Sequence, residues 1–118
     1  MITPLRILIA DNELLIRWSL DQALSQKGYE VFSAENGRKA VEAIEKQTFD
    51  FIITDVMMPE LDGWKVLEAA HRAWPRPRVI IMTTHEKDVK NMAHKKGAWA
   101  YVEKPYLFEK IEELLKLP

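Results

Sequence analysis

Residues 51–63 read Phe-Ile-Ile-Thr-Asp-Val-Met-Met-Pro-Glu-Leu-Asp-Gly, an apolar run that ends in an acid and leads into turn residues. The run Phe51–Thr54 is apolar on both faces and short, so it predicts a β-strand that is covered on both sides. Such strands are typical of parallel sheets with helices on both faces. The stretch therefore indicates an α/β fold, with Asp55 at the carboxyl end of a buried strand.

Outward from this stretch, short apolar runs alternate with longer amphipathic segments. Further strands are expected at residues 5–10, 29–33, 79–82 and 99–102. Helices are expected from Ile16 to Gly28, after Asn36-Gly37 through Ile44, from Gly63 to the residues before Trp74, and at 88–96 and 107–117. Five strands separated by helices predict a doubly wound parallel sheet. The length of 118 residues suits one domain, residues 1–118.

Composition excludes several classes of protein. The chain has no cysteine, which rules out disulfide scaffolds, thiolate metal sites and cysteine nucleophiles. Its formal net charge of -1 lacks the basic excess of a dedicated nucleic-acid binder. No apolar run is long enough to cross a membrane, and the first residues do not resemble a signal peptide. We therefore expect a cytoplasmic protein that binds neither nucleic acid nor membranes directly.

Polar groups follow four of the predicted strands. Asp11, Asp55 and Thr83 stand at or just after strand ends, and Lys104 follows the last strand. In an open parallel sheet these ends meet in one crevice. Asp11, Asp55 and a main-chain carbonyl just after Asp55 could hold Mg²⁺, which prefers oxygen ligands. Asp55 could attack phosphorus, and Thr83 and Lys104 could then bind phosphoryl oxygens.

Each of these residues also has a purely structural interpretation. An Asp at a strand end is often a turn former or a helix cap. Lys104 could be a solvated loop residue, and Thr83 a β-branched strand residue. The presence of suitable groups at four different strand ends is what favours a functional site.

Four segments together resemble the receiver domains of two-component response regulators. They are residues 7–11 (Ile-Leu-Ile-Ala-Asp), residues 55–63 (Asp-Val-Met-Met-Pro-Glu-Leu-Asp-Gly), residues 82–83 (Met-Thr) and residues 103–106 (Glu-Lys-Pro-Tyr). The resemblance extends over essentially the whole chain. It implies a five-stranded, flavodoxin-like sheet in the order 2-1-3-4-5.

The resemblance also implies roles for individual residues. Asp55 would accept a phosphoryl group from a phosphohistidine on a sensor histidine kinase or phosphotransfer protein. Asp11 and the main-chain carbonyl of Met57 would bind Mg²⁺ together with Asp55. Lys104 would pair with the phosphoryl group, and its bond to Pro105 is commonly cis in such domains.

Signalling in this family implies a switch rather than an enzyme that acts on other molecules. Thr83 would move toward the phosphoryl group, and Tyr101 would change its rotamer. The altered surface would comprise residues 88–96, 99–102 and 107–117, where we expect the downstream partner. For Tyr101 the alternative is an ordinary half-buried aromatic residue of an edge strand.

One residue departs from the family pattern. Most receivers carry two adjacent acids after the first strand, whereas here the second position is Asn12, in the slot expected to coordinate the metal most directly. Asp11, Asp55 and Lys104 sum formally to -1, so Mg²⁺ is expected to bind more weakly, with Glu13 contributing through water. Alternatively, the domain is a pseudo-receiver that binds partners without phosphorylation.

Other features have more than one interpretation. Met57 and His85 occupy positions that often control the access of water to the acyl phosphate in this family, although an exposed loop histidine is an equal alternative for His85. The segment Ile16-Arg17-Trp18 is similar to receivers of the nitrogen-regulator type, whose outputs are transcriptional. A basic run is interpreted as a solvated helix face or as a docking patch for an acidic partner: Lys87, Lys90, His94, Lys95 and Lys96.

Two further chemistries are disfavoured. A small phosphatase with an aspartate nucleophile needs a second Asp two residues later, and Met57 stands there. No glycine-rich loop follows the first strand, which argues against cradling of a nucleotide or flavin phosphate.

Overall fold

The computed structural model describes residues 3–83, 87–104 and 107–117. Strands and helices alternate along these residues in the order β1 (Arg6–Ala10), α1 (Leu14–Gln26), β2 (Glu30–Ala34), α2 (Gly37–Lys46), β3 (Phe51–Asp55), α3 (Gly63–Arg72), β4 (Arg78–Thr83), α4 (Lys87–Lys95), β5 (Ala100–Glu103) and α5 (Leu107–Leu115). No helix among the described residues is long and apolar enough to span a membrane.

The five strands form one parallel sheet in the order β2-β1-β3-β4-β5. This confirms the predicted doubly wound α/β fold. The chain runs outward in one direction from β1 to β2 and in the other from β3 to β5, so β1 and β3 are neighbours at the point where the order reverses. Ala10 pairs with Thr54, which places the residues that follow these two strands side by side. Ligand sites of open α/β sheets lie at such a point.

Burial of the strands follows their place in the sheet. All five residues of β3 are buried, and in β1 and β4 only the first residue is partly exposed. The edge strands β2 and β5 are mostly half-exposed. Continuous apolar runs thus correspond to the three central strands, as expected for strands that are covered on both faces.

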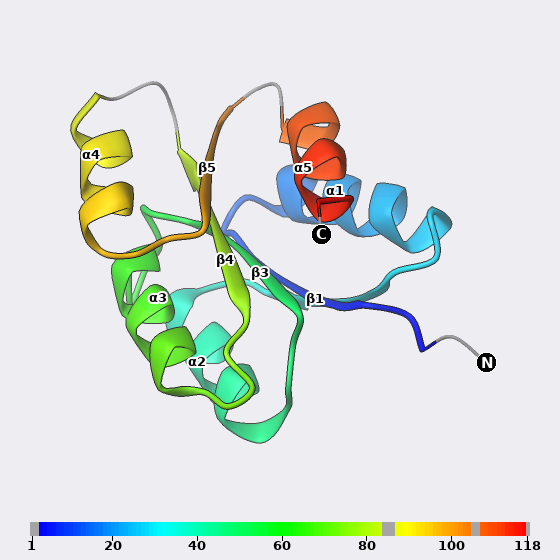
Figure 1. Ribbon diagram of the computed structural model, residues 1–118, viewed down its shortest axis with the longest axis horizontal. Coiled ribbons are helices and arrows are strands. Elements are labelled where there is room, and N and C mark those ends of the chain that lie inside the picture. The colour runs from blue at the N-terminus through cyan, green and yellow to red at the C-terminus, as the bar shows by residue number, and fades with distance from the viewer. Residues whose placement is uncertain (1–2, 84–86, 105–106, 118) are drawn as a thin grey trace.

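Alternate strand residues face opposite layers of helices. Ile7 and Ile9 of β1 belong to a cluster that includes Leu24 of α1 and Ile111 of α5. Leu8 belongs to the other cluster, with α2, α3 and Ala93 of α4. Figure 1 shows this division, with α1 and α5 on one side of the sheet and α2, α3 and α4 on the other.

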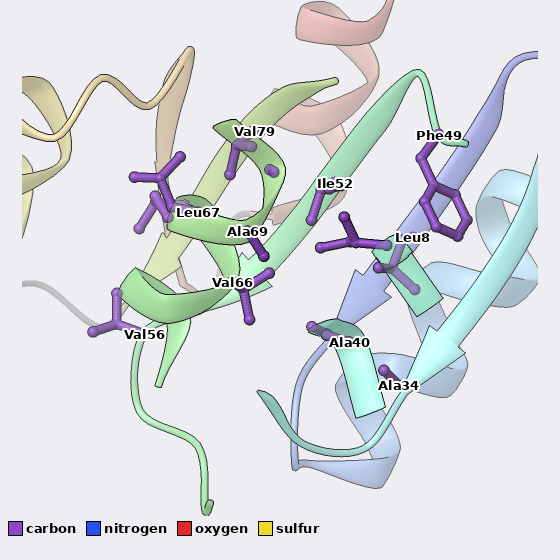
Figure 2. Packing of buried hydrophobic residues seen from close by; sticks show 14 of the residues in the cluster. Leu8, Ala34, Ala40, Phe49, Ile52, Val56, Val66, Leu67, Ala69 and Val79 are labelled. Carbon is purple, nitrogen blue, oxygen red and sulfur yellow. The ribbon is translucent and has the colours of Figure 1, made fainter. Parts of the chain in front are cut away.

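Figure 2 shows the packing of the second cluster, in which Leu8 and Ile52 of the sheet lie beside residues of α2 and α3. Ala40 of α2 is completely buried, as is Val66 of α3. A side chain as small as that of Ala40 lets its helix lie close to the strands. Burial of the larger aliphatic side chains contributes about 1.5–3 kcal/mol each to folding.

The ends of most elements differ by one or two residues from those that the sequence predicts. The last helix ends at Leu115 instead of residue 117, because the amides of Lys116 and Leu117 bond to carbonyls three residues back, which tightens the final turn. After α4, Gly97 has a φ of +82°, a left-handed conformation that favours glycine after a helix.

Candidate functional site

Two aspartates lie side by side at the carboxyl ends of β1 and β3. Asp11 is completely buried and Asp55 is 7% exposed. Each has one carboxylate oxygen fixed by a backbone amide: Oδ1 of Asp11 accepts from the N–H of Glu13 at 2.8 Å, and Oδ1 of Asp55 accepts from the N–H of Val56 at 2.8 Å. In both residues the other oxygen, Oδ2, is directed toward a common partner.

That partner is Lys104. Its Nζ atom lies 3.1 Å from Oδ2 of Asp11, 3.1 Å from Oε1 of Glu13 and 3.1 Å from Oδ2 of Asp55. The backbone N–H of Lys104 donates to the carbonyl of Thr83 at 2.8 Å, which fixes the residue just beyond the end of β5. The structure therefore brings together the predicted residues Asp11, Asp55 and Lys104, and adds Glu13 to them.

The charges of this cluster do not balance. Three carboxylates face one ammonium group, a formal charge of -2 when all four groups are ionised. Burial raises the pKa of Asp11, and the nearby charge of Asp55 raises it further. Burial alone would lower the pKa of Lys104, but the carboxylates of Asp11 and Asp55 outweigh it, so this pKa lies above its ordinary value. The site favours an additional positive charge.

The oxygen atoms fit a hard divalent cation. Ligand atoms of Asp11, Glu13 and Asp55 all lie within 4.8 Å of one another. Oδ2 of Asp11 is buried and accepts no hydrogen bond from the described residues, although it lies at ion-pair distance from Lys104. A buried oxygen of this kind is costly unless a cation or a donor reaches it. The cluster could therefore bind a metal ion such as Mg²⁺.

The loop after β3 is held by its turn residues. Oδ1 of Asp62 accepts from the amides of Trp64 and Lys65 at 3.0 and 3.1 Å, which caps α3. A Cβ atom on Gly63 would lie 2.2 Å from the carbonyl oxygen of Asp55. The Asp-Gly pair thus has a structural role, because it starts α3 in direct contact with the backbone of the acidic residue.

A second close approach lies on the other side of this loop. A Cβ atom on Gly37, at the start of α2, would lie 1.8 Å from the carbonyl oxygen of Leu61. Next to it, Arg38 forms an ion pair with Glu60, whose φ is +72°. These contacts hold the loop against α2. They join residues far apart in the chain, so local sequence patterns do not indicate them.

The other predicted site residues differ from one another in burial. Thr83 is buried at the end of β4, and Tyr101 is half-buried, with its hydroxyl donating to Glu103 at 3.2 Å. Asn12 is exposed, and the side chain of Met57 is 77% exposed. His85 and Pro105 lie outside the described residues, and so does the predicted cis bond at Pro105.

Two residues next to the site were not expected in their observed roles. Glu13 lies within the cluster itself, whereas the sequence suggested only a contact through water. Arg17 donates from Nη1 to the carbonyl of Asp11 at 2.7 Å and so holds the turn after β1. The sequence clue to this role of Arg17 was its position in the first turn of the helix that follows Asp11.

Comparison with known proteins agrees with this geometry. The family model described as the response regulator receiver domain matches residues 7–116. DNA-binding transcriptional regulator NtrC of Escherichia coli is 35% identical over 99 residues, which are 83% of this chain and 21% of NtrC. Sporulation initiation phosphotransferase F of Bacillus subtilis is 31% identical over 112 residues, which are 94% of this chain and 90% of that protein. The chain thus spans about a fifth of the length of NtrC.

Solved structures show the same architecture. A CheY-like receiver domain protein from Methanospirillum hungatei superimposes with a TM-score of 0.86 at 33% identity, covering 96% of this chain and 94% of the other. The response regulator TrrA of Thermotoga maritima, in complex with Mg²⁺ and beryllofluoride, superimposes with a TM-score of 0.83 at 30% identity, covering 94% and 96%.

Proposed function

This chain belongs to the response regulator receiver domain family, and from that premise we propose that Asp55 accepts a phosphoryl group from a phosphohistidine of a sensor histidine kinase or phosphotransfer protein. Residues 1–118 would act as a single receiver domain in the cytoplasm. Phosphorylation would change which partner the domain binds.

The observation that carries this proposal is the contact of Lys104 with Asp55. Oδ2 of Asp55 lies 3.1 Å from Nζ of Lys104, and Asp11 belongs to the same cluster. An ammonium group at this distance is placed to bind an oxygen of a phosphoryl group that reaches the Asp55 carboxylate. The hydroxyl of Thr83, at the end of the neighbouring strand, is the second candidate donor.

The proposed step is a transfer between two proteins. A carboxylate oxygen of Asp55 forms a bond to phosphorus while the bond from phosphorus to the imidazole nitrogen of the donor breaks. The electron pair of that bond stays on the imidazole, which leaves as a neutral base. The product is an acyl phosphate on Asp55, and its later hydrolysis by water restores the carboxylate. The domain thus takes part in its own chemistry without acting as an enzyme on other molecules.

Mg²⁺ fits the cluster of Asp11, Glu13 and Asp55, and the main-chain carbonyl of Met57 is a further ligand implied by the family. When bound, the ion would neutralise charge on the oxygens of the transferring group. Asn12 could offer only a neutral amide oxygen. The protein residues hold the reacting carboxylate in place, through the amide of Val56 on one oxygen and Lys104 on the other.

Two surfaces are candidates for the proteins that bind this domain. Leu14, Leu15 and Trp18 of α1 are exposed large apolar residues close in sequence to the site, and they offer the phosphodonor protein an apolar contact. The downstream partner is proposed to bind the face formed by α4, β5 and α5, with Thr83 and Tyr101 as the residues that transmit the change. Exposed side chains on or next to α4 include Lys90, His94, Lys95 and Lys96.

Beryllofluoride with Mg²⁺ tests this proposal, because it imitates a phosphoryl group on a carboxylate. We expect shifts in the NMR spectrum of the wild-type chain that reach Thr83 and Tyr101, and no shifts in the Asp55→Asn variant. Incubation with a small acyl phosphate should add one phosphoryl group to wild type by intact-mass measurement. A chain that responds to neither reagent would instead be a phosphorylation-independent interaction module, an alternative that the exposed Asn12 favours.

A further inference from the structure

We propose that Glu13 supplies the second metal-facing carboxylate of the site, in place of the acid that position 12 lacks. This inference rests on the proposed function, since it concerns the ion that assists phosphoryl transfer. It assigns to Glu13 a direct part in the affinity for Mg²⁺.

The geometry places a carboxylate oxygen of Glu13 inside the cluster. Oε1 of Glu13 lies 3.1 Å from Nζ of Lys104, the same distance as Oδ2 of Asp55. One carboxylate oxygen of Glu13 also lies within 4.8 Å of those of Asp11 and Asp55. Glu13 and its neighbour Asn12 are both exposed, and Glu13 reaches the cluster through its ion pair with Lys104.

An independent observation concerns the buried carboxylate of Asp11. Oδ2 of Asp11 is buried and accepts no hydrogen bond from the described part of the chain. Asp11 as a whole is 0% exposed. The ammonium group at ion-pair distance from this oxygen is Lys104 Nζ, 3.1 Å away, and Glu13 and Asp55 share it. One positive charge does not balance three carboxylates, which points to a second cation between them.

Local backbone structure explains why the side chain of Glu13 is available for this role. Glu13 is the N-cap residue of α1, yet its side chain makes no capping hydrogen bond. The turn is held by other groups: the amide of Glu13 donates to Oδ1 of Asp11 at 2.8 Å, and Nη1 of Arg17 donates to the carbonyl of Asp11 at 2.7 Å. The carboxylate is therefore free to turn toward the cluster.

The charge of the site changes accordingly. With Glu13 included, three carboxylates and Lys104 give a formal charge of -2, where Asp11, Asp55 and Lys104 alone give -1. This is the charge that a second acid at position 12 would produce. On this proposal Glu13 offsets the formal charge that Asn12 lacks, so Mg²⁺ binding is weakened less than the sequence predicts from Asn12.

Isothermal titration calorimetry with MgCl₂ tests this inference on four chains: wild type, Glu13→Gln, the double variant Asn12→Asp/Glu13→Gln, and Glu35→Gln. Glu35 is a matched control, because it follows β2 at the same edge of the sheet, is exposed and lies outside the cluster. Glu13→Gln should weaken Mg²⁺ binding by about 10-fold or more. The double variant should recover most of that loss. Glu35→Gln should stay within about twofold of wild type, because the Glu35 carboxylate lies outside the cluster and salt screens its charge from the site.

Each outcome decides a different question. Equal affinities of Glu13→Gln and Glu35→Gln would overturn the inference and leave the proposed function intact. A loss in Glu13→Gln that Asn12→Asp fails to restore would also overturn it, because the acid at position 13 would then not replace one at position 12. If wild type itself shows no binding of Mg²⁺, the proposed function fails and the inference fails with it. Circular dichroism of each chain checks that the exposed substitutions leave the fold unchanged.

Discussion

Nζ of Lys104 donates a hydrogen bond to Oδ2 of Asp55 at 3.1 Å, although 49 residues separate the two in the chain. Both side chains are only 9% exposed, so the contact is formed in a largely dry environment. It joins the loop after β5 to the end of the central strand β3, which lies two strands away in the sheet. The contact therefore joins two distant parts of the chain at the candidate site.

Lys104→Met should destabilise the metal-free chain. It removes the shared ammonium and leaves the buried carboxylate of Asp11 next to that of Asp55 with no cation between them. The free energy of unfolding, measured with urea in the presence of a chelator, should fall by about 3 kcal/mol. Lys65→Met is the control, because Lys65 forms an exposed ion pair with Glu68, worth at most about 1 kcal/mol. Equal losses in the two variants would show that the cluster does not contribute to stability.

Asp11→Asn should stabilise the metal-free chain near neutral pH. The pKa of Asp11 is raised in the folded state, chiefly by burial, so the folded chain binds this proton more tightly than the unfolded chain. Stability therefore declines as the pH rises above the ordinary pKa of 3.8 and through the raised one. The variant lacks this decline, so its free energy of unfolding at pH 7 should exceed that of wild type by on the order of 1 kcal/mol.

Urea unfolding of wild type and Asp11→Asn across a pH series, with chelator present, measures this effect. The two stability curves should diverge as the pH rises above 3.8. Parallel curves would mean that the ionisation of Asp11 has the same cost in the folded and unfolded chains. Added Mg²⁺ should stabilise wild type more than the variant, because a ligand stabilises the state that binds it.

Gly63→Ala should disturb the backbone of Asp55. The new methyl group would meet the carbonyl oxygen of Asp55 at 2.2 Å, so the loop or the strand must move. We expect a loss of about 3 kcal/mol in the free energy of unfolding, at the upper end for overpacking. Gly28→Ala is the reference: its new methyl group meets nothing within 4 Å, and only its φ of +98° is unfavourable, at about 1 kcal/mol. A Gly63→Ala loss no larger than that of Gly28→Ala would contradict the close approach.

Asp62→Ala should remove the cap of α3. Two amides, those of Trp64 and Lys65, would lose their acceptor, at a cost of about 1 kcal/mol in thermal or urea unfolding. Asp62→Asn keeps an oxygen acceptor in the same place and should remain close to wild type. If Asp62→Asn loses as much stability as Asp62→Ala, the charge of Asp62 stabilises the helix instead of its capping hydrogen bonds.

The order and type of the elements were largely predictable from local patterns. The continuous apolar run Phe51–Thr54 predicted a strand covered on both faces, and all of β3 is buried. Gly28 and Gly97 predicted the ends of two helices, and both have positive φ. Such signals lie within a few residues of the structure that they specify, because hydrogen bonds and side-chain direction in helices and strands repeat over short distances.

The components of the site were predictable only as candidates at strand ends. Asp11, Asp55 and Lys104 were named from their positions, and the parallel sheet confirmed that they meet. For Glu13 the sequence suggested a contribution to the metal site through water, but its contact with Lys104 was not predictable because 91 residues separate the two. Nor were the contacts of Gly63 with Asp55, or of Gly37 with Leu61, because their spacing depends on how two loops fit together.

The sequence by itself therefore determined the alternation of strands and helices, the family and the chemical types available at the strand ends. Only the tertiary structure decided which of these groups share one ammonium. Apolar patterning acts along the chain through periods of two or 3.6 residues. By contrast, the placing of Glu13, Asp55 and Lys104 within 3.1 Å contacts depends on strand order and register, which are set by the packing of the whole sheet against its two layers of helices.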